Sequence, residues 1–170
     1  ATDHSCNAAM ARELRDLIEA RTAVVAVIGL GYVGLPLAMA CANSGFRVIG
    51  LDVDPDKVSE LLAGRSYIDA VESGGLAAAI ACKGLDPTTD YARLAEADVA
   101  IICVPTPLSR NREPDLRFIE RTAEAIAAHL RPGQLIILES TTYPGTTEEV
   151  LVPILERSGY LCSRDFFVGF

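Results

Sequence analysis

The feature that most constrains the fold is an uncharged segment, residues 22–46, that contains a short glycine motif. An apolar segment of this length could span a membrane as a helix. It holds Gly29, Gly31, Gly34 and Pro36, however, and its flanks lack the basic and aromatic residues that border membrane helices. A buried strand over residues 24–28, a glycine turn and a buried helix to about Ser44 explain the same apolar character. We therefore expect a strand–turn–helix unit and no membrane association.

The alternation of apolar strands and helical segments continues to the last residue. Further strands are expected over residues 47–52, 85–89, 99–104, 135–139 and 166–170. Helices are expected between them, over residues 55–63, 91–97, 115–130 and 146–158, with a short one near 76–82 in the less regular segment 66–83. Strands separated by helices pair in parallel through right-handed crossovers. The predicted fold class is therefore α/β, a Rossmann-type doubly wound sheet of six parallel strands in the order 3-2-1-4-5-6.

A separate helix is expected before the first strand. Residues 8–20 place four apolar side chains on one helical face, namely Met10, Leu14, Leu17 and Ile18. We expect this helix to pack on the main body and the first five or six residues to be loose. The chain then divides into an N-terminal extension, residues 1–22, and a Rossmann-type α/β domain, residues 23–170.

Composition excludes several classes of function. The net charge of −8 argues against a nucleic-acid partner, because phosphate neutralisation needs a basic face. It is compatible with a dinucleotide, whose phosphates can be held by backbone N–H groups. The five cysteines form no C-x-x-C pair, so we expect reduced thiols, no metal site and a cytoplasmic location. The polar first twenty residues predict no signal peptide.

The glycine motif predicts a dinucleotide site. Gly29-Leu30-Gly31-Tyr32-Val33-Gly34 has G-x-G-x-x-G spacing, follows a strand directly and opens a helix. The first glycine permits the tight turn, the second leaves room for the pyrophosphate, and the third lets helix and strand approach. Asp52 stands at the end of the next strand, where its carboxylate can accept ribose hydroxyl protons and repel a 2′-phosphate. This favours NAD over NADP. Lys57 could approach the same ribose, or it could be a solvated helix lysine.

Two further loops follow strands whose carboxyl ends should meet at the same edge. Thr106 lies between Pro105 and Pro107 in a stiff loop, where it could contact a ligand or simply form a turn. Residues 139–142, Glu-Ser-Thr-Thr, could position a nicotinamide ribose or a water, or cap the next helix. Thr146-Thr147-Glu148-Glu149 has the spacing of a capping box. The polar residues 109–113 are expected to form a loop.

No convincing nucleophile or acid–base set is visible. His4 lies in the extension and His129 near a helix end, and both are interpreted as incidental. Cys103 lies within a predicted buried strand and is not interpreted as a nucleophile.

Together these motifs resemble the UDP-glucose/GDP-mannose dehydrogenase family, the nucleotide-sugar 6-dehydrogenases. The resemblance covers residues 8–170 and rests on four features in order: Val27 to Ala38 around the glycine turn, Asp52 with Lys57, Cys103 to Pro107, and Ser140-Thr141 followed by Pro144-Gly145-Thr146. Within the family, residues 139–147 look most like the branch that oxidises UDP-N-acetylglucosamine to its uronic acid.

The resemblance implies a reaction and a set of NAD contacts. The family oxidises the sugar C6 alcohol to a carboxylate with two NAD⁺ in succession. The implied NAD-binding residues are Gly29, Gly31, Tyr32, Val33, Gly34, Asp52, Lys57, Val104, Pro105, Thr106, Ser140 and Thr141. Thr141 would also have an auxiliary catalytic role, because it would help to hold a water or the reacting oxygen.

The resemblance also implies what this chain lacks. The family's catalytic Cys, Lys and Asn lie in later segments that nothing here matches. We therefore expect an NAD-binding domain that is inactive alone, a UDP-sugar bound mainly by an absent C-terminal domain, and a homo-oligomeric full-length enzyme. The alternatives are a UDP-N-acetylmannosamine or UDP-glucose dehydrogenase, a two-domain dehydrogenase of the 6-phosphogluconate or 3-hydroxyisobutyrate type, and a non-enzymatic NAD sensor.

Overall fold

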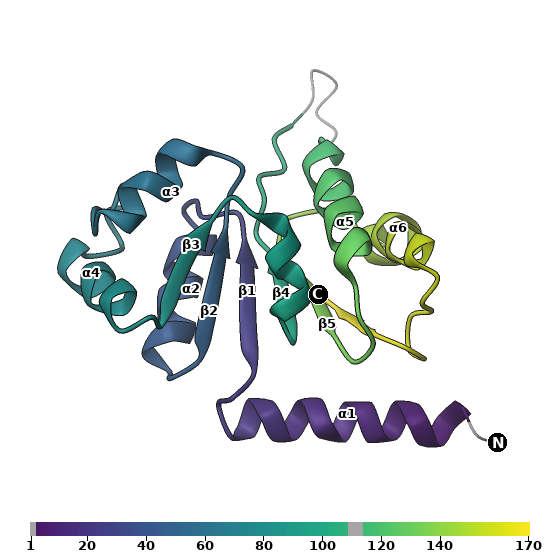
Figure 1. Ribbon diagram of the computed structural model, residues 1–170. Coiled ribbons are helices and arrows are strands. Elements are labelled where there is room, and N and C mark those ends of the chain that lie inside the picture. The colour runs from purple at the N-terminus through teal and green to yellow at the C-terminus, as the bar shows by residue number, and fades with distance from the viewer. Residues whose placement is uncertain (1–2, 109–113) are drawn as a thin grey trace.

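The fold is built around one parallel sheet, as the computed structural model in Figure 1 shows; it describes residues 3–108 and 114–170, with side chains from residue 7. The strands are β1 (Val24–Ile28), β2 (Arg47–Leu51), β3 (Leu85–Thr88), β4 (Val99–Ile102), β5 (Leu135–Leu138) and β6 (Phe167–Gly169). Their order, β3-β2-β1-β4-β5-β6, confirms the predicted doubly wound topology.

The register of the strands brings four loops to one edge. Ile28 pairs with both Leu51 and Ile102, and Ile102 pairs with Leu138, so these strands end at the same level. The predicted strands ended slightly later than the observed ones. Because β2, β4 and β5 end at Leu51, Ile102 and Leu138, the residues Asp52, Val104 and Glu139 lie in the loops just beyond the sheet, where a ligand can reach them.

Helices cover both faces of the sheet. One face carries α5 (Arg117–His129), α6 (Val152–Leu155) and the 3₁₀ helix η1 (Tyr91–Glu96); the other carries α2 (Gly34–Asn43), α3 (Pro55–Leu62) and α4 (Ser73–Ala81). Two hydrophobic clusters, one on each face, result from this layering. The β-branched and aliphatic residues of β1 alternate between them, since Ala26 and Ile28 belong to one cluster and Val25 and Val27 to the other.

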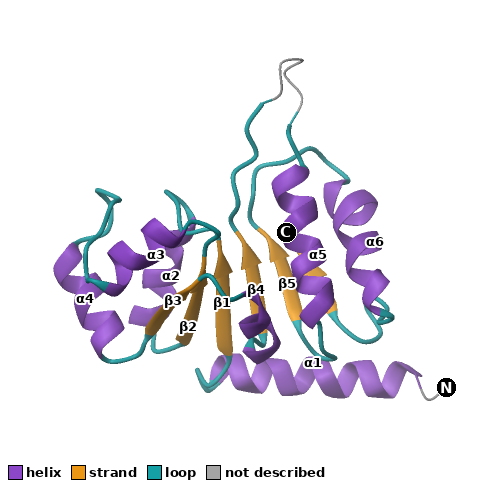
Figure 2. Cartoon of the chain, turned by 45° about the horizontal axis from the view of Figure 1, so that its top comes forward, coloured by secondary structure: helices purple, strands orange, loops and turns teal. Residues whose placement is uncertain are grey.

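The extension forms helix α1 (Asp3–Glu19), which runs across the edge where the strands begin (Figures 1 and 2). Leu14 is buried in the hydrophobic cluster on the face of the sheet that α2 covers. Ile18, which was expected on the same helical face, is 37% exposed. The helix already begins at Asp3, so the expectation of a loose segment was wrong for residues 3–6; residues 1–2 lie outside the described residues. The helices of the described residues fall short of the length and apolar character needed to cross a bilayer.

The last predicted helix is distorted. Residues 147–158 form a π-helical turn η2 (Thr147–Leu151), the short α6, and a 3₁₀ turn η3 (Glu156–Ser158). Pro153 lacks an N–H and crowds the preceding turn, which explains the irregularity. The capping-box prediction was also wrong, since Thr146 caps no N–H and its hydroxyl donates to the Tyr143 carbonyl at 2.8 Å. The loop predicted over residues 109–113 lies outside the described residues.

Candidate functional site: a cleft at the carboxyl ends of the strands

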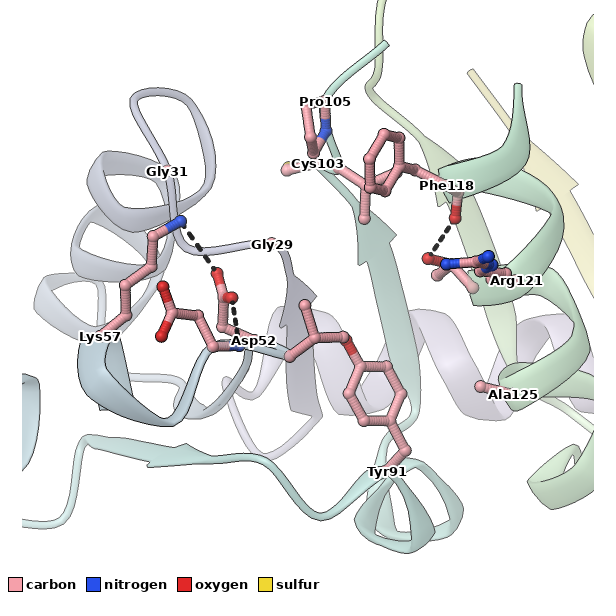
Figure 3. A pocket seen from close by; sticks show the side chains of 14 residues that line it. Gly29, Gly31, Asp52, Lys57, Tyr91, Cys103, Pro105, Phe118, Arg121 and Ala125 are labelled. Atoms are coloured by element: carbon pink, nitrogen blue, oxygen red, sulfur yellow. Dashed lines mark hydrogen bonds and ion pairs between the residues drawn. The ribbon is translucent and has the colours of Figure 1, made fainter. Parts of the chain in front are cut away.

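A cleft of about 540 Å³ opens where the sheet reverses its winding, between the loops after β1, β2 and β4. Figure 3 shows Asp52 and Lys57 on one side, Phe118 and Arg121 on the other, and Tyr91 between them. This is the position at which doubly wound sheets bind ligands. Its lining consists of Gly29, Gly31, Asp52, Val53, Asp54, Lys57, Tyr91, Cys103, Val104, Pro105, Phe118, Arg121, Thr122 and Ala125.

The three glycines of the turn have three different surroundings. Gly29 has φ +92°, and a Cβ there would lie 2.7 Å from the Cys103 carbonyl oxygen. A Cβ on Gly34 would lie 1.6 Å from the Gly29 carbonyl oxygen, which makes it a packing glycine. A Cβ on Gly31 would meet no protein atom within 4 Å, although Gly31 lines the cleft. Its missing side chain therefore leaves space for a ligand and is not required by packing.

The start of α2 suits an anion. Its N-cap, Val33, makes no side-chain cap, and the first turn contains no acidic residue. The Leu35 N–H already donates to the Gly31 carbonyl at 3.1 Å and Pro36 has no N–H, but the helix dipole still favours negative charge there. Tyr32 and Val33 point away from the fold, at 82% and 57% exposure, and neither lines the cleft.

Asp52 is held in place by the backbone around it. Its side chain is buried, its Oδ2 accepts from the Leu30 N–H at 2.9 Å, and its Oδ1 accepts from the Asp54 N–H at 3.0 Å. Each carboxylate oxygen retains a further acceptor position. Lys57 Nζ lies 3.7 Å from Asp52 Oδ2 and 6.0 Å from the centre of the Tyr67 ring. Lys57 therefore lines the cleft as an ion-pair partner and is not a free solvated lysine.

The sequence analysis did not predict the residues of the opposite wall of the cleft. Phe118, Arg121, Thr122 and Ala125 reach the cleft from one face of α5, and Tyr91 reaches it from η1. The spacing of the α5 residues follows one helical face, which is a signal that could have identified them. Burial and the charge of Asp52 raise the pKa of Tyr91 to about 12, so its hydroxyl stays neutral near pH 7.

Cys103 lies in the cleft, although its chemistry is that of a buried thiol. Burial, with smaller contributions from Glu139 and Cys41, raises its pKa to about 12. A thiol that stays protonated is a poor nucleophile. Cys103 follows the end of β4 and is only partly buried, so its expected position within a buried strand was wrong; that it is not a nucleophile stays a prediction.

The loops after β4 and β5 are joined by a reciprocal pair of hydrogen bonds. The Thr106 hydroxyl donates to the Thr141 carbonyl at 2.6 Å, and the Ser140 hydroxyl donates to the Val104 carbonyl at 2.8 Å. Both hydroxyl protons thus join the two loops to each other. Ser140 and Thr141 line a second cavity of about 510 Å³, with residues 142–148, Leu138 and Phe170.

The predicted site residues are therefore divided. Six line the cleft, namely Gly29, Gly31, Asp52, Lys57, Val104 and Pro105. The other six border it or lie beside it: Tyr32, Val33, Gly34, Thr106, Ser140 and Thr141. The described residues hold no cluster of three or more His, Cys, Asp or Glu side chains that could bind a metal ion.

Comparison with known proteins identifies the family to which the chain belongs. The sequence profile of the UDP-glucose/GDP-mannose dehydrogenase family, NAD binding domain, matches residues 23–168. A UDP-N-acetyl-D-glucosamine 6-dehydrogenase from Pseudomonas aeruginosa is 40% identical over 147 residues, which is 86% of this chain and 34% of that protein. A UDP-N-acetyl-D-mannosamine dehydrogenase from Pyrococcus horikoshii is 37% identical and covers 85% of this chain and 35% of its own length.

Solved structures show the same fold. A GDP-mannose dehydrogenase from Pseudomonas aeruginosa, crystallised as a ternary complex, superposes with a TM-score of 0.80 at 34% identity, covering 85% of this chain and 34% of that one. A UDP-N-acetylmannosamine dehydrogenase structure from Pyrococcus horikoshii gives a TM-score of 0.79 at 37% identity, covering 85% and 35%. The chain thus spans about a third of the length of the relatives it matches.

Proposed function

Because the chain belongs to the UDP-glucose/GDP-mannose dehydrogenase family, as its NAD-binding domain, we propose that the cleft holds NAD in an enzyme oxidising a UDP-sugar at C6. The observation that carries the cofactor site is Gly31, where an absent Cβ leaves ligand space beside the start of α2. The proposed substrate is UDP-N-acetylglucosamine, whose C6 alcohol would become a carboxylate.

The residues of the cleft have the chemistry that NAD requires. The glycine turn and the start of α2 would hold the diphosphate, and Asp52 would accept the hydroxyls of a ribose, with Lys57 beside it. Val53, Tyr91, Phe118 and Ala125 offer an apolar wall suited to a base. The nicotinamide ring, when bound, accepts the hydride that leaves the alcohol carbon. Two carboxylates at the ribose end, Asp52 and Asp54, disfavour a 2′-phosphate and support NAD over NADP.

The catalytic assignments stay predictions. The proposed auxiliary role of Thr141 rests on the family resemblance, and the structure supports it only by holding residues 140–141 against the β4 loop. The nucleophilic Cys and the main UDP-sugar contacts are proposed to lie outside this chain. The cytoplasmic location and the homo-oligomeric state of the whole enzyme also remain predictions.

The substrate assignment is supported by relatives named UDP-N-acetyl-D-glucosamine 6-dehydrogenase, at 40% and 39% identity. Residues 139–147 also resemble that branch. UDP-N-acetylmannosamine is a second candidate, because relatives named as its dehydrogenases reach 37% and 39% identity. An oxidation assay of the whole enzyme on these two sugars and UDP-glucose would decide. Equal rates on all three would contradict the substrate proposal.

Calorimetric titration of this chain with NAD⁺ and NADP⁺ tests the cofactor site. We expect NADP⁺ to bind at least about tenfold more weakly than NAD⁺, because Asp52 would face a phosphate. Asp52→Ala should weaken NAD⁺ binding about tenfold or more, since it removes charged hydrogen bonds. Asp86→Ala is the matched control, because Asp86 is a carboxylate that pairs with Arg93 away from the cleft. Absence of NAD⁺ binding by the folded chain would overturn the proposal.

A further inference from the structure

Tyr67 does not line the cleft, but its side chain reaches the glycine turn. Its hydroxyl donates to the Leu30 carbonyl at 2.6 Å, while the Leu30 N–H donates to Asp52 Oδ2 at 2.9 Å. Leu30 itself is fully buried. The backbone N–H and carbonyl of Leu30 are therefore both held by side chains. Asp52, which follows β2, holds the N–H, and Tyr67, from the segment after α3, holds the carbonyl.

The segment that carries Tyr67 is held by hydrogen bonds and by packing on the body of the domain. The Ser66 hydroxyl donates to the Ile68 carbonyl at 3.0 Å, and the Ser66 N–H donates to the Ser73 hydroxyl at 3.0 Å. Ile68 and Val71 are buried in the cluster on the α2 face. The backbone of Tyr67 is thus anchored at both sides, so its hydroxyl approaches the turn from a fixed position.

A peptide unit is planar, so the direction of a carbonyl fixes that of the following N–H. The bond from Tyr67 to the Leu30 carbonyl therefore orients the Gly31 N–H. We propose that Tyr67 is a positioning residue of the NAD site, which sets the Leu30–Gly31 peptide in the orientation that the diphosphate needs. This inference rests on the proposed NAD site and adds a residue from the segment 66–83, whose structure the sequence left open.

The surroundings of Tyr67 favour a stable donor. Lys57 Nζ lies over its ring, and the same ammonium pairs with Asp52, so the three side chains enclose the turn from one side. Burial and the charges of Asp52 and Asp54 raise the pKa of Tyr67 above its usual value. The hydroxyl consequently keeps its proton, and with it the hydrogen bond, throughout the physiological pH range.

The test compares Tyr67→Phe with Tyr160→Phe. The first substitution removes the hydroxyl and keeps the ring beside Lys57. The second removes a hydroxyl from a half-buried tyrosine that packs on the cluster of the α5 face, away from the turn. The readouts are the dissociation constant for NAD⁺ by calorimetry, the urea midpoint, and the amide resonance of Gly31 in a ¹H–¹⁵N spectrum.

We expect Tyr67→Phe to raise the dissociation constant for NAD⁺ roughly five- to tenfold, the equivalent of one hydrogen bond, and to shift or broaden the Gly31 resonance. Tyr160→Phe should change neither. A purely structural role would lower the urea midpoint while the folded protein bound NAD⁺ as before, and that result would overturn the inference. If the parent chain binds no NAD⁺, the cofactor proposal fails separately. An unchanged Gly31 resonance in Tyr67→Phe would then overturn the role of Tyr67.

Discussion

Gly31 and Gly34 belong to one turn, but a methyl group added at each would meet different surroundings. At Gly34 it would overlap the Gly29 carbonyl oxygen, whereas at Gly31 it would project into open space. We expect Gly34→Ala to reduce the free energy of unfolding by about 3 kcal/mol or more, because backbone must move. Gly31→Ala should leave it within about 0.5 kcal/mol and still weaken NAD⁺ binding about tenfold or more. Urea titration and calorimetry on both variants check this.

Gly75→Ala serves as the control for that pair. Gly75 lies within α4, and a Cβ there would meet no atom within 4 Å, as at Gly31. Alanine at this third helical position should stabilise the fold, by up to roughly 0.5–1 kcal/mol, without affecting NAD⁺ binding. A Gly31→Ala chain that bound NAD⁺ with the parent's affinity would contradict the role given to this glycine.

Among the helices, α3 has an N-terminal cap formed by the side chain of Asp54. Asp54 accepts the Asp56 N–H at 2.9 Å, and Pro55 occupies the first helical position. Asp54→Ala should lower the free energy of unfolding by about 1 kcal/mol, measured by urea titration. Asp54→Asn keeps an acceptor oxygen and should retain most of that stability. Equal losses in both variants would argue that charge, and not the cap, is what matters at this position.

The loops after β4 and β5 should move as one unit, because Thr106 and Ser140 each donate a hydrogen bond to the other loop. Thr106→Val removes one of these bonds and should lower the free energy of unfolding by about 1 kcal/mol. It should also speed amide exchange in residues 139–142. Thr106→Ser keeps the hydroxyl and is the matched control, so it should retain most of the stability; an equal loss in the serine and valine variants would contradict the role given to this hydrogen bond.

The order of the strands could be predicted because the central ones are short apolar runs, such as Val24–Ile28, which is followed at once by Gly29. The far wall of the cleft could not, because Phe118 and Tyr91 reach it through the packing of α5 and η1 on the sheet. The hydroxyls of Thr106 and Ser140 were correctly placed on adjoining loops. The carbonyls that accept these hydroxyls depend on how closely the loops after β4 and β5 approach each other, and no local sequence pattern encodes that distance. Pro153, by contrast, argues against a regular last helix from the sequence alone.

For the whole molecule, alkaline pH should weaken folding. The pKa values of Cys103 and Tyr91 are raised to about 12, so the folded chain keeps protons that the unfolded chain loses from about pH 9 upward. The folded state then binds more protons than the unfolded state, and the free energy of unfolding falls as the pH rises. Urea midpoints at pH 8 and 10.5 should show this fall, and Cys103→Ala with Tyr91→Phe should reduce it. Equal midpoints in the parent chain would contradict the prediction.

Helix α1 and the cleft lie at opposite edges of the sheet, one where the strands begin and one where they end (Figures 1 and 2). Several side chains of α1, such as those of Arg15 and Glu19, are exposed and face no part of the cleft. Helix α1 is therefore a site at which the domain could be attached without covering the cleft. A fluorophore or a sensor surface attached through α1 would leave the cofactor edge open to diffusion, so that the domain could report NAD⁺ concentration while it is immobilised.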